Sequence, residues 1–401
     1  MAAVRVALIA LVCAALGAAG ALGIGRATGL VGGSTSTTIV ERQAPLGVSA
    51  PAVRAVVAPV VASRGFSPAR IFAERSPGVV TVFTFSGGQE SQGSGFVVSA
   101  DGTILTNAHV ITDAGEAGPG AQVKAAASVY VEFGDHDRVP AKIVGWDVFD
   151  DVGVIRVAPS AHRLEPLPLG RSATAVVGEP VAAIGSPLGN ENSLAVGVVS
   201  AVGRSIAALT APHFQLIDAI QTDAPIAHGS SGGPLLDASG RVIGINAQIR
   251  SDTSGSAGIG FAVPIDAARR SLADLLAGRH VAYAYVGIQS EDLTSSLARR
   301  LGLGASHGAL VDHVTAGGPA ARAGIRGGAH EASFQGQTVV TGGDVVLAVD
   351  GLPVRSADDL VRIVTNRLRP GTTAVLTVLR GGRSSRVVVR LGVRPSNPQQ
   401  P

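Results

Sequence analysis

Short apolar runs separated by turn residues fill the chain from about residue 68 to residue 272. They lie at 78–85, 93–99, 103–111, 129–133, 141–147, 151–157, 179–185 and 241–249. Turn pairs such as Asp101-Gly102 and Ser239-Gly240 stand between the runs. Many short strands in succession predict an all-β barrel or sandwich, not the alternating strands and helices of a parallel sheet.

Residues 283–393 form a second block with a mixed pattern, following a helical stretch at 265–281. Residues 319–323 are rich in alanine and are followed by Gly324, which predicts a short helix stopped by glycine. Leu360, Ile363, Val364 and Leu368 recur with the period of an amphipathic helix. Strand-like runs surround both helices, and 327–343 is expected to be an extra loop. The block therefore predicts a small α+β domain.

The N-terminal residues 6–25 are uninterrupted by charge and lie between Arg5 and Arg26. As a helix, this stretch would span roughly 30 Å, the thickness of the bilayer's hydrocarbon. Residues 1–26 therefore predict a membrane-anchoring helix. The alternative is a cleaved secretory signal, with 19–21 as its small-residue site. Either segment exports the rest of the chain, with 27–67 as a linker and 394–401 as a tail.

The amino-acid composition argues against several classes of protein. Hydrophobic residues make up 46% of the chain and charged residues 15%, so most of it can bury a core. The net charge of +3 and aromatic content of 3% argue against nucleic acid as a partner. The single cysteine excludes an intramolecular disulfide, and the histidines lack ligand spacing, so we expect neither a metal nor a cofactor.

Three polar residues among the apolar runs are candidate catalytic residues. His109 closes a predicted strand in TNAHV, Asp151 stands directly before another, and Ser231 lies in the turn GSSGGP. Acyl transfer needs a hydroxyl nucleophile, an imidazole that takes its proton and a carboxylate that orients the imidazole. Glycines around Ser231 permit a tight turn whose N–H groups face a developing oxyanion. The order His, Asp, Ser is that of chymotrypsin-type enzymes.

The segments TNAHVI, DDVGVIRV, GSSGGPLL and the downstream GIGFAVP resemble the HtrA (Deg) family of chymotrypsin-fold serine proteases. The resemblance implies a mainly β fold, with a chymotrypsin-like double β-barrel over 68–272 followed by an α+β PDZ domain over 283–393. Two positions depart from the family pattern. Ser230 stands where Asn is usual, and Gly153 where Ala is usual, but neither change removes a catalytic group.

The resemblance also implies roles for individual residues. His109 would be the general base and then the acid, Asp151 its orienting carboxylate, and Ser231 the nucleophile. The N–H groups of Gly229 and Ser231 would form the oxyanion hole. Asp150 competes with Asp151, but the family places its acid directly before the apolar strand, which favours Asp151.

Substrate specificity is expected from the residues just before the nucleophile. In this fold the sixth residue before it lies at the base of the substrate pocket, which here is Pro225, followed by Ile226 and Ala227. No carboxylate is present to bind Arg or Lys, so cleavage after small or medium aliphatic residues is predicted. Alternatively, these residues only shape a loop.

The C-terminal block is similar to a PDZ domain, which binds the C-terminal end of an extended peptide beside a helix. Its carboxylate-binding loop would be Tyr285, Val286, Gly287 and Ile288, although this tetrapeptide alone could be an ordinary strand.

Taken together, the sequence predicts an exported serine endopeptidase, tethered to the cell membrane or periplasmic. Its substrates would be unfolded or damaged envelope proteins, and C-terminal peptides would bind at the PDZ domain. The family resemblance implies a homo-oligomer, often a trimer. One alternative is a resting or inactive tethered chaperone or adaptor that binds unfolded polypeptides. Another is an esterase or other acyl transferase.

Overall fold

The computed structural model describes residues 65–114, 123–186, 192–208, 210–211, 214–227, 229–250 and 259–395. The predicted anchor or signal at 1–26, nearly all of the linker and most of the C-terminal tail lie outside these residues. Within the described part, no helix has the length and apolar character needed to cross a membrane.

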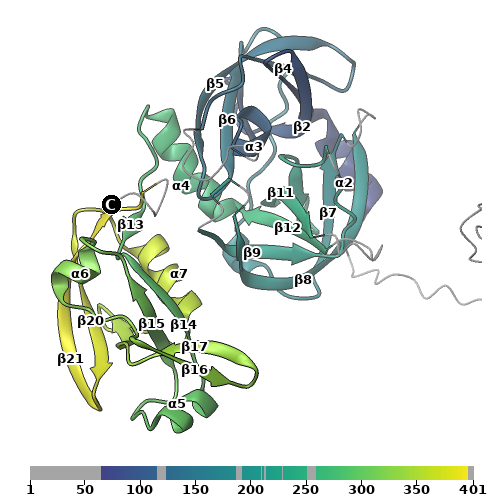
Figure 1. Cartoon of the computed structure of the whole chain (residues 1–401). Coiled ribbons are helices and arrows are strands. Elements are labelled where there is room, and N and C mark those ends of the chain that lie inside the picture. Colours follow the sequence, from purple (N-terminus) through teal and green to yellow (C-terminus); the bar gives the residue numbers. More distant parts are fainter. Residues whose placement is uncertain are drawn as a thin grey trace, which may run out of the picture. The chain divides into compact units, whose positions relative to one another are not determined.

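The first barrel is a closed, antiparallel sheet. Its strands are β1 (Val79–Ser86), β2 (Gln89–Val97), β3 (Thr103–Thr106), β4 (Ser128–Glu132), β5 (Arg138–Asp147) and β6 (Val152–Val157). They pair in the order β1-β2-β3-β6-β5-β4, and β1 closes the barrel by pairing with β4. Strands β2, β4, β5 and β6 of this barrel are labelled in Figure 1. The helices α2 (Pro68–Arg75) and η1 (Ser76–Gly78) precede β1, and α3 (Ala108–Ile111) follows β3.

The second barrel has the same construction. Its strands are β7 (Pro180–Gly185), β8 (Ser193–Ala207), β9 (Gln215–Thr222), β10 (Pro234–Leu236), β11 (Val242–Arg250) and β12 (Ile259–Pro264), with η2 (Ser172–Thr174) before them. They pair in the order β10-β11-β12-β9-β8-β7, and β10 closes the barrel against β7. The predicted mainly β fold with a double β-barrel is therefore confirmed, and each barrel has six strands.

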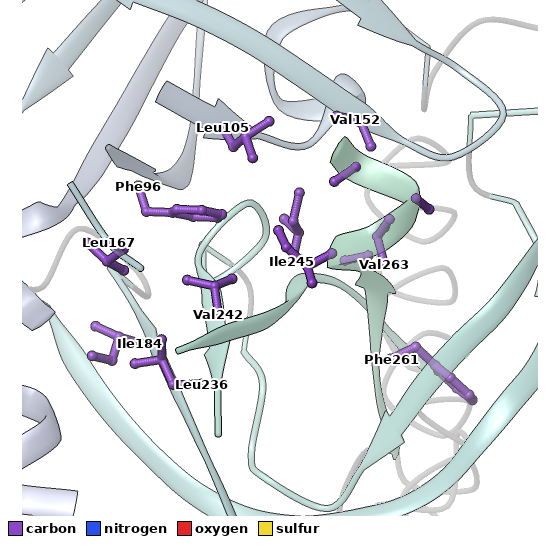
Figure 2. Close-up of a cluster of buried hydrophobic side chains, with 14 of the residues drawn as sticks. Phe96, Leu105, Val152, Leu167, Ile184, Leu236, Val242, Ile245, Phe261 and Val263 are labelled. Carbon is purple, nitrogen blue, oxygen red and sulfur yellow. The ribbon is translucent and has the colours of Figure 1, made fainter. Parts of the chain in front are cut away.

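A shared hydrophobic cluster joins the two barrels (Figure 2). Successive strand residues point to opposite faces, so Leu105 lies in the shared cluster while its neighbour Ile104 lies in the first barrel's own cluster. Phe96 from β2 and Ile245 from β11 meet in the shared cluster, and both are fully buried. Burying such a side chain stabilises the fold by roughly 1.5–3 kcal/mol. This two-sided burial explains why the apolar runs are continuous.

Helix α4 (Ile265–Leu276) follows β12 without a loop and completes the shared cluster. It contributes Ile265, Ala268 and Leu275 to that cluster. Asp266 in its first turn accepts hydrogen bonds from the Ser172 hydroxyl and the Ala173 N–H, both at 2.9 Å. The helix continues four residues beyond 272, where the sequence placed the end of this domain.

The C-terminal domain is an α+β unit, also drawn in Figure 1. Its strands are β13 (Ala284–Tyr285), β14 (Ile288–Leu293), β15 (Gly308–Val314), β16 (His330–Phe334), β17 (Gln337–Thr341), β18 (Val345–Val349), β19 (Leu352–Pro353), β20 (Thr373–Arg380), β21 (Arg383–Arg390) and β22 (Gly392–Val393). Its helices are α5 (Ser295–Leu301), α6 (Pro319–Ala323) and α7 (Ala357–Arg367). The main sheet runs β14-β15-β18-β20-β21. Both predicted helices are present, and Gly324 ends α6 with a φ of +79°.

Two local predictions are wrong. The segment 327–343 is not a plain loop but contains the β16–β17 hairpin, whose turn residues Gln335 and Gly336 have φ of +52° and +81°. Positive φ at both central residues gives the strand twist that a tight hairpin needs. His109 does not close a strand, because β3 ends at Thr106 and His109 lies on the short helix α3.

Candidate active site

His109 and Asp151 are in direct contact in the first barrel. The His109 Nδ1 atom lies 2.7 Å from Asp151 Oδ2, and the main-chain N–H of His109 donates to Asp151 Oδ1 at 3.0 Å. Both carboxylate oxygens are therefore bonded to one residue. This double contact fixes the orientation of the imidazole and leaves its Nε2 atom for other chemistry.

The backbone of Asp151 is held in an uncommon conformation. Its φ of +51° lies in the left-handed region, which costs of order 1–3 kcal/mol for such a residue. Asn107, directly before α3, is fully buried and donates from its side-chain amide to the Asp151 carbonyl at 2.8 Å. The strained turn between β5 and β6 is thus tied to the start of α3. The contact between Asp151 and His109 depends on that tie.

The environment of His109 shifts its basicity. Burial alone would lower the pKa of His109, but the charge and the hydrogen bond of Asp151 outweigh burial and raise this pKa above its ordinary value. The Asp151 side chain is only 5% exposed, and that of His109 is 20% exposed. A shielded carboxylate next to a partly open imidazole suits a group that must accept a proton from a bound molecule.

The turn that contains Ser231 requires glycine at the next position, 232. Gly232 follows it with a φ of +89°, and a Cβ there would lie 2.1 Å from the Ser94 carbonyl oxygen. The Gly232 N–H donates to Asn246 O at 2.8 Å, and the Ser231 carbonyl accepts the Ser94 N–H at 2.7 Å. Ser94 belongs to the first barrel, so the Ser231 turn of the second barrel is bonded across the junction.

The hydrogen bonds around Ser231 show which of its neighbouring groups already have a partner. The Ser231 hydroxyl donates to Ala247 O at 3.1 Å, and within the described residues no hydrogen bond joins it to His109. The N–H groups of Gly229 and Ser231 donate to no other oxygen in the described part of the chain. The Gly229 carbonyl accepts the Ser94 hydroxyl at 2.6 Å. The two N–H groups are therefore available to a bound molecule.

Asp150, the competing acid, contacts residues other than His109. Its Oδ2 atom lies 2.8 Å from the hydroxyl of Tyr283 and 3.6 Å from the guanidinium of Arg270. Burial and the nearby charge of Asp147 raise the pKa of Asp150 to about 6. The carboxylate that contacts the imidazole is that of Asp151.

The residues proposed for the substrate pocket differ in exposure. Ile226 is buried in the hydrophobic cluster of the second barrel, while Pro225 and Ala227 are exposed. Ile226 lies against β12, where a Cβ added to Gly260 would approach its Cδ1 atom to 2.8 Å. Residues 225–227 lie just before the Ser231 turn, and the aliphatic-pocket hypothesis stays a prediction.

The predicted carboxylate-binding loop of the C-terminal domain forms a bend between β13 and β14. Gly287 has a φ of +80°, and its carbonyl accepts the Thr315 N–H at 3.0 Å. The Val286 side chain is buried, and its carbonyl accepts the Ala320 N–H at 2.9 Å. Tyr285 and Ile288 instead line a cavity of about 680 Å³ that β14 shares with α7. The bend is therefore open to that cavity at two of its four residues.

Sequence reasoning missed three residues that hold this site. Asn107 lies inside the quoted segment TNAHV, so its position beside His109 was visible but its bond to Asp151 was not. Ser94 lies in the apolar run 93–99, where a serine among apolar residues gave a weak signal. Nothing in the sequence linked Tyr283 to Asp150, which is 133 residues away along the chain.

Two protein-family models match the chain. Residues 93–245 match a trypsin-like peptidase domain, and residues 284–391 match a PDZ domain. A curated relative from Pseudomonas fluorescens, described as a probable periplasmic serine endoprotease, DegP-like, is 36% identical over 306 residues, or 76% of this chain. A relative from Halomonas elongata with the same description is 37% identical over 309 residues, or 77% of this chain. The chain spans only 57% and 58% of the lengths of these relatives.

Solved structures of HtrA-type proteases are also similar to this chain, and the similarity covers almost the whole length of each solved chain. The HtrA-type protease AlgW with a tripeptide matches with a TM-score of 0.68 and 33% identity, covering 82% of this chain and 98% of AlgW. The same protease with a decapeptide gives a TM-score of 0.64 and 31% identity, over 82% of this chain and 99% of that one. A serine endoprotease from Yersinia pestis matches with a TM-score of 0.59 and 29% identity, over 82% and 98%.

Proposed function

Because this chain belongs to the HtrA family of serine proteases that carry a C-terminal PDZ domain, we propose that it is a serine endopeptidase using Ser231, His109 and Asp151. The observation that carries the proposal is the double contact of Asp151 with His109, at 2.7 Å and 3.0 Å. A carboxylate bonded in this way fixes the imidazole tautomer whose Nε2 atom accepts a proton.

Acylation follows from the atoms at the site. The Ser231 hydroxyl has one proton, now donated to Ala247 O, so that bond must break before His109 can take the proton. The Ser231 oxygen then attacks the carbonyl carbon of the peptide bond, and His109 Nε2 receives the proton. Asp151 stabilises the imidazolium that forms, which is consistent with the raised pKa of His109.

The N–H groups of Gly229 and Ser231 would stabilise the oxyanion of the tetrahedral intermediate. Their freedom from other acceptors in the described residues supports this role. The imidazolium then gives its proton to the leaving amine, and the peptide bond breaks. A water molecule, deprotonated by His109, hydrolyses the acyl-enzyme and restores Ser231.

We assign peptide binding to the C-terminal domain. Its cavity between β14 and α7 is where an extended peptide could add to the edge of the sheet. Tyr285, Val286, Gly287 and Ile288 would supply the N–H groups for the terminal carboxylate. The similar AlgW structures are described with a tripeptide and a decapeptide.

The proposed substrates are unfolded or damaged envelope proteins, which offer extended backbone to the site. Residues 6–25 would carry the enzyme out of the cytoplasm, as a single-pass anchor or as a cleaved signal, and the periplasmic relatives support export. We further propose a homo-oligomer, a trimer by family resemblance. Light scattering on the purified chain measures its mass, and a reporter fused after residue 40 measures export.

The first experiment incubates the full chain with a permanently unfolded protein and looks for fragments. Ser231→Ala is the test variant, and Ser239→Ala, an exposed serine in the turn before β11, is the matched control. We expect fragments from the wild type and Ser239→Ala alone. Equal proteolysis by Ser231→Ala would overturn the assignment.

A resting chaperone or adaptor is the second candidate. The observation that favours it is the bond from the Ser231 hydroxyl to Ala247, which holds the nucleophile's proton away from His109. Such a protein would prevent aggregation of the unfolded protein without producing fragments. Adding a C-terminal peptide distinguishes the two states, because a resting protease would then begin to cut and an inactive adaptor would not.

A further inference from the structure

Two acidic side chains in the turn that precedes Asp151 contact the same phenol hydroxyl. The Tyr283 oxygen lies 2.6 Å from Asp147 Oδ2 and 2.8 Å from Asp150 Oδ2. All three side chains are buried. Asp147 ends β5, Asp150 lies in the following turn, and Tyr283 follows α4, so the phenol ties the turn to the far end of the domain.

The two short contacts of the Tyr283 oxygen need two hydrogens, one more than the phenol supplies when both carboxyl groups are ionised. A phenol has a single hydrogen and can donate it to one carboxylate only. Both oxygen–oxygen distances fall within the range of O–H···O hydrogen bonds, 2.5–3.0 Å. The second short contact therefore needs a hydrogen that comes from a protonated carboxyl group. One of the two acids must donate to the phenol oxygen.

The donor partners of the two acids identify which carboxyl is protonated. Asp147 accepts the Phe149 N–H at 2.9 Å through Oδ1 and the Ser271 hydroxyl at 2.7 Å through Oδ2. Asp147 therefore accepts hydrogen bonds from two donors other than Tyr283. Besides Tyr283, the Asp150 carboxyl has no hydrogen-bond partner among the described residues, and its ion pair with the Arg270 guanidinium is long, at 3.6 Å. This difference in donors assigns the proton to Asp150.

The charged surroundings of Asp150 agree with this assignment. Burial and the charge of Asp147 raise the pKa of Asp150 to about 6, although the cations Arg270 and Arg394 act in the opposite direction. Burial and both carboxylates raise the pKa of Tyr283 well above its ordinary value, so the phenol keeps its hydrogen. Its ring packs edge-to-face against the ring of Phe149, with the centroids 5.4 Å apart.

This cluster acts on the residue that orients the imidazole. Asp150 is covalently next to Asp151, whose left-handed φ of +51° is held only by its surroundings. The Asp147 carboxylate accepts N–H groups of the same turn, from Phe149 at 2.9 Å and Asp150 at 3.4 Å. Fixing both acids to Tyr283 therefore restrains the turn at its first residue and at the residue directly before Asp151.

We propose that protonated Asp150 donates to Tyr283 and Tyr283 donates to Asp147, and that this relay makes Tyr283 a positioning residue for Asp151. The proposal rests on the proposed function, because it assigns Asp151 to the protease site. Ionisation of Asp150 would remove one of the two hydrogen bonds and place two carboxylates against one phenol. The turn would then hold Asp151 less firmly.

The test measures kcat/KM of the full chain for an activated p-nitrophenyl ester of acetyl-valine. Tyr283→Phe removes the hydroxyl and keeps the ring, while Tyr130→Phe, beside Phe85 in the first barrel, is the control. Asp150→Asn keeps a donor, and Asp150→Leu has similar size and none. We expect losses of about tenfold or more in Tyr283→Phe and Asp150→Leu, and changes under about threefold in the other two. Equal losses in both Asp150 variants, or none in Tyr283→Phe, would overturn the relay.

A second readout does not depend on catalysis. The folded chain holds a proton on Asp150 that the unfolded chain releases above about pH 4. The stability of the wild type should therefore fall, relative to that of Asp150→Asn, as the pH rises from about 4 to about 6. We expect the difference in Tm between the two proteins to change by several degrees over this interval. A constant difference would place the proton elsewhere. Hydrolysis that survives Ser231→Ala would instead contradict the proposed function and leave this measurement valid.

Discussion

The Ser94 hydroxyl donates to the carbonyl oxygen of Gly229 at 2.6 Å, so a strand of the first barrel holds the turn that carries the proposed nucleophile in the second. The same hydroxyl accepts the Ser186 N–H at 2.9 Å. Ser94 is fully buried, and its two bonds are therefore shielded from water. The relative position of Ser231 and His109 depends on contacts of this kind, because the two residues belong to different barrels.

Ser94→Ala should lower both stability and activity. It leaves the Gly229 carbonyl and the buried Ser186 N–H without this partner, at a cost of about 1–3 kcal/mol in the free energy of unfolding. The freed turn should reduce kcat/KM about tenfold. Urea unfolding and ester hydrolysis measure the two effects. Ser91→Ala, at the exposed end of the same strand, is the control and should change neither.

Gly232→Ala should prevent correct folding of the nucleophile turn. Besides the positive φ, the added methyl would lie 2.1 Å from Ser94 O and 2.3 Å from Thr106 Oγ1. We expect a loss of about 3–5 kcal/mol and no measurable hydrolysis. Gly134→Ala is the control, because a Cβ there meets nothing within 4 Å. A Gly232→Ala protein as stable as the control would show that the turn has another conformation in solution.

The pH profile should report His109 through Asp151. His109 acts as a base only when neutral, so kcat/KM should be lost as the pH falls through a pKa above 6.5. Asp151→Asn removes the negative charge that raises this pKa and weakens the hydrogen bond, while burial, which lowers the pKa, remains. The acidic limb should therefore move to lower pH, while the maximal rate falls about 10⁴-fold. An acidic limb that stays in place would mean that Asp151 does not set the basicity of His109.

Cleavage of a peptide library should occur after small and medium aliphatic residues such as Val, Ala and Leu. Pro225, Ile226 and Ala227 provide no carboxylate for a basic side chain, and Ile226 is buried in an apolar cluster. Mass spectrometry of the products identifies the residue before each cut. Preferential cleavage after Arg or Lys would contradict the aliphatic pocket.

The sequence predicted the barrels well because their strands carry local signals. Ile104 and Leu105 are both apolar since one lies inside the first barrel and the other between the barrels, and such continuous runs are easy to find. The β16–β17 hairpin was missed because Gln335-Gly336 is a weaker turn signal than the pairs Asn-Gly or Asp-Gly. His109 was expected at the end of a strand, since α3 is only four residues long.

The site was predictable only as far as its motifs reach. His109, Asp151 and Ser231 each stand in a recognisable segment, and the structure brings the first two together. The supporting bonds of Ser94 and Tyr283 join positions 135 and 133 residues apart, and no local pattern encodes such a contact. The proton that we propose on Asp150 has no sequence signal either, because it follows from the burial of two acids at one phenol.

The position of α4 at the end of the protease domain has a consequence for synthesis. The chain emerges N-terminus first, and the first barrel has all its strands once Val157 is available. The cluster between the barrels still lacks Ile265, Ala268 and Leu275 until α4 has been made. His109 and Ser231, which lie in different barrels, therefore reach their final relative position only after the whole domain through α4 has been synthesised.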